Sequence, residues 1–249
     1  MTRPLVLIHG FTGSPASWEQ VRAALPSDVP VLAPALVGHD GTAGSPGVRT
    51  FDDELDRLAR VVRDAGFEGA RVAGYSMGGR VALGLLVRHP GLFSGATIIG
   101  ANPGMTHPGD QEKRAAEEEE WARLLEREGV PTFVATWEAL PLWGTQDALD
   151  PAAVARQRRI RLSHDPAGLA RALRALGLAA MPDYRPRLGD VAVPVDLVVG
   201  EHDAKFRALA AEMDRLIPRS RVLVVAGAGH NVVLERPAEV ARLIQELDG

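Results

Sequence analysis

The sequence predicts an α/β fold, a mostly parallel β-sheet flanked by helices with an inserted helical cap. Three observations predict it. Short apolar, β-branched runs alternate with longer segments of helical periodicity, which is typical of a parallel sheet with crossover helices. Between residues 102 and 187 this alternation stops and no strand is evident. A serine flanked by glycines stands where a predicted strand gives way to a predicted helix.

The predicted strands are continuous apolar runs, each closely followed by glycine or proline. Continuous apolarity indicates that both faces of a strand are buried, as in a parallel sheet covered on both sides. The six predicted strands are Pro4 to Ile8, Pro30 to Ala33, Ala70 to Ala73, Ala96 to Ile99, Pro194 to Val199 and Arg221 to Val225.

The predicted helices lie between these strands. They are Ala16 to Leu25, Phe51 to Asp64, Met77 to His89, Phe206 to Leu216 and Pro237 to Leu247. In the last of them a proline stands at the helix start, where its missing N–H is harmless. Together with the strands they assign residues 1–101 and 188–249 to an α/β core.

Residues 102–187 are predicted to form the helical cap, because glutamate, arginine and alanine become abundant at helical spacing. The cap interrupts the sheet between the strand ending near Ile99 and the strand beginning near Pro194. It should therefore cover the carboxyl ends of the strands, where open α/β sheets bind ligands. We interpret the four-glutamate run Glu117 to Glu120 as a solvated helix face.

The composition fits a globular protein, with 249 residues of which 46% are hydrophobic and 24% charged. This length suits one large α/β domain or two small ones. The net charge of −4 argues against nucleic acid or an anionic membrane as partner. The absence of cysteine excludes disulfides, thiolate metal sites and a cysteine nucleophile.

The apolar run Leu5 to Ile8 is ended by His9 and Gly10, well short of a signal-peptide core. No stretch approaches the ~20 apolar residues that span a bilayer. We therefore expect a cytoplasmic protein, and the sequence leaves its oligomeric state open.

Residues 74–78 have the pattern G-x-S-x-G, directly after a predicted strand and at the start of a predicted helix. This is the context of a nucleophile elbow, since glycines around Ser76 permit the strained turn that exposes the hydroxyl. A serine before a helix could also be a simple N-cap. The context favours the nucleophile and narrows the predicted fold to the α/β-hydrolase fold.

A serine hydroxyl becomes a useful nucleophile or base when a histidine takes its proton and a carboxylate orients that histidine. Asp203 and His230 follow the last two predicted strands, and the order serine, aspartate, histidine is the order of this fold. Alone, Asp203 could cap a helix and His230 could be an ordinary loop histidine. Their joint position predicts a catalytic triad of Ser76, Asp203 and His230.

In this fold a His-Gly pair after the first strand shapes the loop that gives an oxyanion-hole amide. Here the pair is His9 and Gly10. The backbone N–H groups of Phe11 and of Met77, the residue after the serine, would then form the oxyanion hole. The other histidines show no metal-ligand spacing, and we expect no metal site; they are His39, His89, His107, His164 and His202.

Arg80 follows Ser76 by four residues on one predicted helix, so the two side chains share a face. An unpaired guanidinium there would be costly. It could form a structural ion pair with an internal carboxylate, or it could clamp a substrate carboxylate through two hydrogen bonds.

Two cap segments also carry arginine. Arg114, Glu118, Trp121 and Leu125 fall on one face of a predicted helix, and Arg161 lies in an arginine-rich run. Arg114 and Arg161 could each be solvated or face the site. If both converged with Arg80, the three would form a pocket for a polyanionic small molecule.

The chain resembles the α/β-hydrolase-fold lyases of menaquinone (vitamin K2) biosynthesis, the 2-succinyl-6-hydroxy-2,4-cyclohexadiene-1-carboxylate synthases. The resemblance runs almost end to end, and its specific strings are GYSMGGR and D-x-K-F, whereas G-x-S-x-G alone indicates only the superfamily. The matching parts are His9 to Ser14, Gly74 to Arg80, Asn102 to Gly104, Arg114 to Trp121, Trp137, Arg161 and Gly200 to Phe206.

The resemblance implies a lyase with a tricarboxylate substrate and no cofactor. Ser76, with His230 as its base, would remove the hydrogen α to a succinyl ketone, the oxyanion hole would hold the enolate, and pyruvate would leave. The residues implied are Ser76, Asp203 and His230 as triad, Phe11 and Met77 as oxyanion amides, and Tyr75, Arg80, Arg114, Trp137 and Arg161 as substrate-binding residues.

Two alternatives stay open. The first is a hydrolase of the same fold, an esterase or carbon–carbon bond hydrolase that acts on a small anionic substrate. The second is a small-molecule receptor that keeps a hydrolase scaffold. An intact triad with both oxyanion elements weighs against the receptor, and Arg80 weighs against an esterase for neutral lipids. The fold alone does not decide between these functions.

Overall fold

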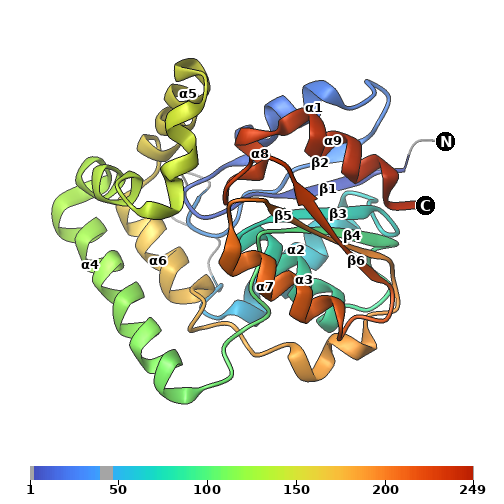
Figure 1. Cartoon of the computed structure of the whole chain (residues 1–249). Helices are drawn as coiled ribbons and strands as arrows, with labels where there is room; N and C mark the ends of the chain where they lie inside the picture. Colours follow the sequence, from blue (N-terminus) through green and yellow to red (C-terminus); the bar gives the residue numbers. More distant parts are fainter. Residues whose placement is uncertain (1–2, 40–46, 249) are drawn as a thin grey trace.

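Six strands form one sheet in a computed structural model of the chain, which describes residues 3–39 and 47–248 (Figure 1). The strand order is β2-β1-β3-β4-β5-β6, and each of the five pairings found is parallel. All six strands lie where the sequence predicts them, with ends shifted by one or two residues. They are β1 (Leu5–Ile8), β2 (Val31–Leu32), β3 (Arg71–Tyr75), β4 (Gly95–Ile99), β5 (Val195–Gly200) and β6 (Ser220–Val225).

Helices cover both faces of the sheet, as Figure 1 shows. One face carries α2 (Phe51–Asp64), α3 (Met77–Arg88) and α7 (Ala204–Asp214). The other carries α1 (Glu19–Ala24), the short α8 (Val232–Glu235) and α9 (Pro237–Gln245), which the 3-10 helix η4 (Glu246–Asp248) follows. Within the described residues no helix combines the length and the apolar character that crossing a membrane requires.

The predicted helix from Ala16 to Leu25 is wrong in its first part. A 3-10 helix, η1 (Pro15–Trp18), precedes α1. Ser14 starts η1 with a capping box, because its side chain accepts a hydrogen bond from the Ala16 N–H and the Ser17 side chain accepts one from the Ser14 N–H. This local bonding begins the tighter 3-10 turn before the α-helix.

The core lies on both sides of β1, and alternate residues of the strand serve the two layers. Val6 and Ile8 pack in the cluster with α2 and α3, whereas Leu5 and Leu7 pack in the cluster with α1 and α9. All four side chains are buried. Burial of each contributes about 1.5 to 3 kcal/mol to stability, which explains why β1 is apolar throughout. The prediction that both faces of each strand are buried is wrong for β2 and β6, because they are the edge strands of the sheet: β2 is half-buried and Val224 of β6 is 49% exposed.

Between β4 and β5 the chain leaves the sheet and forms the inserted segment, residues 100–194 (Figure 1). Its elements are α4 (Pro108–Glu138), η2 (Pro141–Ala148), α5 (Pro151–Leu162), α6 (Pro166–Leu176) and η3 (Arg185–Asp190). Helix α4 is kinked at Gly129, where φ is +79°, just before Pro131. The segment has its own apolar cluster between α4 and α6.

The two ends of the inserted segment meet. The Tyr184 N–H donates to the Pro103 carbonyl at 2.8 Å, and an Nη of Arg185 donates to the Gly104 carbonyl at 2.9 Å. Gly104 has φ +121°, and a Cβ there would lie 2.5 Å from the Cα of Asp183. The close approach of these two chain segments therefore requires glycine at position 104.

The interpretation of Glu117 to Glu120 as a solvated helix face is wrong for Glu118, which is only 5% exposed. Its carboxylate accepts hydrogen bonds from the N–H groups of Leu178 and Ala179, at 2.7 and 3.2 Å, and from Arg114 at 2.8 Å. Glu118 thus holds the turn that follows α6 against α4.

Candidate active site

The turn from β3 to α3 carries Ser76 in a backbone conformation that side chains rarely adopt, with φ +52° and ψ −110°. Such a conformation costs about 1 to 3 kcal/mol and persists where its surroundings enforce it. The flanking glycines allow the close packing: a Cβ on Gly74 would lie 2.2 Å from the Gly78 carbonyl, and one on Gly78 would lie 2.2 Å from the Ile8 carbonyl. The turn exposes the serine hydroxyl above the end of β3.

Ser76, His230 and Asp203 lie together, and both expected contacts are present. Nδ1 of His230 donates to the Asp203 carboxylate at 2.7 Å, and Nε2 is 3.2 Å from the Ser76 hydroxyl oxygen. With its proton on Nδ1, the ring can accept the serine proton at Nε2. His230 and Asp203 are buried, at 3% and 8% exposure.

Asp203 does two things with one carboxylate. Oδ2 bonds His230, while Oδ1 accepts the Phe206 N–H at 3.3 Å and caps α7. Asp203 is thus both the cap of α7 and the carboxylate that orients His230, the two roles that its sequence position suggested. The cap also explains why α7 starts at Ala204, two residues before the predicted start. The Phe206 ring packs on His230 with centroids 4.4 Å apart.

The loop that holds His230 is fixed by Glu235. One carboxylate oxygen accepts the Gly229 N–H at 2.6 Å and the other accepts the Asn231 N–H at 3.2 Å. Glu235 is 5% exposed. These two bonds flank His230 and set the position of its backbone.

The two candidate oxyanion amides are free to bind a ligand. Met77 is the first residue of α3, whose leading N–H groups have no partner within the helix. In the part of the chain that the structure describes, neither the Phe11 nor the Met77 N–H donates a hydrogen bond to the protein.

Three buried histidines hold the loop around Phe11. Thr12, at φ +60°, donates its N–H to His39 Nε2 at 3.1 Å and accepts from His164 Nε2 at 3.1 Å. His9 Nε2 accepts the Leu36 N–H at 3.1 Å, and Nδ1 donates to the Gly10 carbonyl. Burial lowers the pKa of His9 to about 4 and lowers the pKa of His39 and of His164. The three rings are therefore neutral at pH 7.

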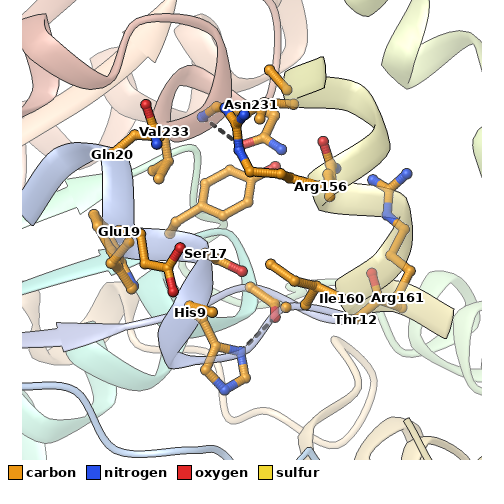
Figure 2. A pocket seen from close by; sticks show the side chains of 18 of the residues that line it. His9, Thr12, Ser17, Glu19, Gln20, Arg156, Ile160, Arg161, Asn231 and Val233 are labelled. Carbon is orange, nitrogen blue, oxygen red and sulfur yellow. Dashed lines mark hydrogen bonds between the residues drawn. The ribbon is translucent and has the colours of Figure 1, made fainter. Parts of the chain in front are cut away.

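A pocket of about 290 Å³ is lined by Phe11 and by Tyr75 and Asn231, which adjoin Ser76 and His230 in sequence; the triad residues themselves are not part of its lining. Figure 2 shows its walls. Ser17, Glu19 and Gln20 line one side, α5 supplies Arg156, Ile160 and Arg161 on the other, and His9, Thr12, Asn231 and Val233 complete the lining.

Two of the candidate binding residues lie in this pocket. The Tyr75 hydroxyl is buried and has no hydrogen-bond partner among the described residues; burial also raises its pKa. Arg161 is 4% exposed, donates to Glu138 at 2.9 Å and lies 5.0 Å from the centre of the Trp143 ring. Burial lowers the pKa of Arg161, although the hydrogen bond to Glu138 and its negative charge act to raise it.

Arg80 and Arg114 lie elsewhere, near Glu118, and neither lines this pocket. Arg80 is 9% exposed and donates to the Leu176 carbonyl at 2.8 Å; burial lowers its pKa to about 10, against the opposing charge of Glu118. Arg114 is ion-paired with Glu118 at 2.8 Å, and its side chain is 39% exposed. The three arginines thus do not converge on one point.

Trp137 connects the inserted segment to the oxyanion loop, since its ring lies 5.6 Å from that of Phe11. It also stacks on Phe133 at 5.6 Å. Its Nε1 is buried without a hydrogen-bond partner among the described residues. Sequence reasoning missed Trp143, whose Nε1 donates to the Trp137 carbonyl and whose ring lies 5.9 Å from His230.

Comparisons with known proteins agree over nearly the whole chain. A model of the alpha/beta hydrolase family matches residues 5–243. The 2-succinyl-6-hydroxy-2,4-cyclohexadiene-1-carboxylate synthase of Enterobacter sp. (strain 638) is 33% identical over 244 residues, which cover 98% of this chain and 90% of that protein.

Two solved structures have the same fold. MenH from S. aureus is 30% identical, with a TM-score of 0.94 over 99% of this chain and 94% of that chain. A thermophilic esterase from Thermogutta terrifontis, with malate bound, is 28% identical, with a TM-score of 0.84 over 99% of this chain and 89% of that chain.

Proposed function

Because the chain belongs to the alpha/beta hydrolase family and, within it, to the 2-succinyl-6-hydroxy-2,4-cyclohexadiene-1-carboxylate synthases, we propose that Ser76, His230 and Asp203 perform the elimination that forms this product. The enzyme is a carbon–oxygen lyase. It removes pyruvate from an enolpyruvyl-succinyl-cyclohexene carboxylate and leaves 2-succinyl-6-hydroxy-2,4-cyclohexadiene-1-carboxylate.

In the proposed mechanism the triad moves a proton and forms no ester. Asp203 keeps the Nδ1 proton of His230 in place, so Nε2 takes the proton of the Ser76 hydroxyl. The serine oxygen in turn removes the hydrogen α to the succinyl ketone. The electron pair of that C–H bond becomes an enolate, whose oxygen the Phe11 and Met77 N–H groups stabilise.

The second half of the reaction breaks the carbon–oxygen bond to the enolpyruvyl group. The enolate electrons return through the ring and form the new double bond, while the leaving oxygen departs with its electron pair. The proton taken from the substrate is passed on to the departing enolpyruvate, which becomes pyruvate, and Ser76 and His230 regain their starting protonation. Substrate and products balance without an added oxidant, reductant or water.

The observation that carries the proposal is the coincidence of three features at one place. The relay from Ser76 to Asp203 is within hydrogen-bond distance at both steps, two N–H groups beside it have no protein partner among the described residues, and arginines line the neighbouring pocket. An enolate with several carboxylates is the kind of species that such a site stabilises.

We extend the proposal to the substrate class and the compartment. The buried Arg80 and Arg161 support a small polycarboxylate as substrate, and Arg114 adds a further cation on the side of Arg80, where it pairs with Glu118. The esterase relative with bound malate shows that a protein of this fold can hold a dicarboxylate. Such a substrate needs neither nucleic acid nor a membrane as partner. Because charged groups cross a bilayer only at high cost, a polycarboxylate stays in the compartment in which it forms, and we propose that this compartment is the cytoplasm.

The test is to supply the enolpyruvyl precursor and measure pyruvate and the diene product together. We expect one pyruvate for each diene formed, with no added metal or cofactor. Rapid hydrolysis of a small carboxylic ester without pyruvate release from the precursor would instead make the protein an esterase.

A further inference from the structure

Helix α5 carries four arginines, Arg156, Arg158, Arg159 and Arg161, and Arg156 is half-buried whereas Arg159 is exposed. Arg158 and Arg161 share Glu138 as an ion-pair partner. Arg156 is half-buried and extends from α5 into the pocket (Figure 2). Among the described residues it has no ion pair, hydrogen bond or ring contact. A guanidinium directed into a pocket without a protein partner is available to a ligand.

The pocket contains a second polar group without a partner. Tyr75 is 9% exposed, and its hydroxyl is buried without a hydrogen bond in the described structure. A buried polar group in this state costs about 1 to 3 kcal/mol. A ligand that accepts a hydrogen bond would remove that cost. Arg156 and Tyr75 are both donors, so their shared complement is an acceptor such as a carboxylate.

The charges around the pocket also favour an anion. Its lining includes three arginines, Arg156, Arg159 and Arg161, and one acid, Glu19. Glu138, outside the lining, balances Arg161. Glu19 is exposed on the opposite wall (Figure 2). The lining therefore retains a positive charge, carried by Arg156 and Arg159, of which Arg156 is the more buried.

We propose that this pocket is a carboxylate subsite in which Arg156 pairs with one carboxylate of the substrate while the Tyr75 hydroxyl donates a hydrogen bond to the same ligand. The proposal rests on the proposed function for the identity of the ligand. Arg80 lies outside the pocket and serves a different carboxylate. A substrate with several carboxylates is then held at two separate points around the triad, and Arg156 is a specificity-determining residue.

The test compares Arg156→Gln and Arg156→Lys with Arg60→Gln. Arg60 is the matched control, because it is an exposed arginine of α2 that has no protein partner among the described residues and lies outside the pocket. Two readouts are needed: KM and kcat for pyruvate release, and the affinity of the free protein for succinate, measured by titration calorimetry.

We expect Arg156→Gln to raise KM roughly tenfold or more with little change in kcat, because the contact is made equally in the bound substrate and in the transition state. Succinate affinity should fall by a similar factor. Arg156→Lys should recover part of both, since it keeps the charge, and Arg60→Gln should match the wild type. An unchanged unfolding midpoint in Arg156→Gln would exclude a folding defect.

The outcomes separate the subsite from the proposed function. If the wild type releases no pyruvate but binds succinate in an Arg156-dependent way, the lyase reaction is wrong and the subsite stands. If Arg156→Gln binds succinate as the wild type does, the subsite is wrong even in an active lyase. An equal loss in Arg60→Gln would also overturn it, because net charge alone would then explain the effect.

Discussion

Ser76 and His230 form one proton-transfer unit, since the 3.2 Å contact between them is the path of the proton. We predict that Ser76→Ala or His230→Ala lowers kcat for pyruvate release by ~10³-fold or more, and that the double variant is scarcely worse than either single one. The folded state should change little. Multiplicative losses in the double variant, or an active Ser76→Ala enzyme, would assign the chemistry to another group.

Arg80 is the buried cation four residues after Ser76, and in its proposed role the planar guanidinium donates two parallel hydrogen bonds to a substrate carboxylate. We predict that Arg80→Lys is nearly as impaired as Arg80→Ala, with a loss on the order of 2 to 5 kcal/mol in kcat/KM for the polycarboxylate substrate. An ammonium offers no planar pair of donors. The comparison is the ratio of specificity constants for this substrate and for a small neutral ester.

The bond from Arg80 to the Leu176 carbonyl makes a stability control necessary. If both variants lose activity on the ester as much as on the polycarboxylate, Arg80 supports the elbow structurally. The case for an anionic substrate would then depend on Arg156 and Arg161.

At the scale of single elements, the elbow depends on how closely α3 approaches β1. A Cβ on Gly78 would lie 2.2 Å from the Ile8 carbonyl and 2.4 Å from the His9 carbonyl. We predict that Gly78→Ala destabilises the protein by about 1 to 3 kcal/mol, because backbone must move to relieve the overlap. Denaturant unfolding measures the loss. Gly144→Ala is the matched control, since a Cβ there meets nothing within 4 Å; equal stabilities of the two variants would contradict the argument.

The strands and most helices could be predicted because their signals are local. Apolar runs mark the strands, and Thr50 with Asp53 forms a capping box that starts α2 at its predicted residue, Phe51. Where the prediction was wrong, a side-chain hydrogen bond outweighed periodicity. Ser14 starts a 3-10 turn before α1, and Asp203 starts α7 early because it is both a cap and the partner of His230.

The functional residues likewise fall into those with a local sequence signal and those without one. Ser76, Asp203 and His230 each follow a predicted strand in a recognisable motif, so the sequence alone predicts that they form a triad. His39 and His164 could not be found, because they bond Thr12 from 27 and 152 residues away along the chain. No local pattern marks such partners, and only the folded sheet and inserted segment bring them to the loop.

For the whole molecule, the three buried histidines link stability to pH. Their pKa values are lowered by burial in the folded state, to about 4 for His9 from its ordinary 6.5. The unfolded chain therefore binds protons more readily. We predict full stability above about pH 6.5 and a progressive loss between pH 6.5 and about 4, on the order of 3 kcal/mol from His9 alone.

Denaturant unfolding at pH 7.5 and pH 5 measures this loss. His39→Gln should reduce it, because it removes one of the groups that must be protonated, whereas His202→Gln, at an exposed position, should leave it unchanged. A free energy of unfolding that is flat over this range would show that the histidines titrate normally in the folded protein.

The meeting of the two ends of the inserted segment at Pro103 and Tyr184 bears on the order in which the chain folds. Strands β4 and β5 are neighbours, with Ala96 opposite Val195, although the whole segment separates them in sequence. Closing a long flexible loop is slow and costs entropy. If the segment collapses first around its own apolar cluster, only a short effective tether joins the two strands. The entropic contribution to the free-energy cost of pairing them then falls by on the order of 1 to 2 kcal/mol. The pairing of β4 with β5, at the centre of the sheet, should then form after the inserted segment has folded. An early contact outside the sheet would thus determine when the centre of the sheet forms.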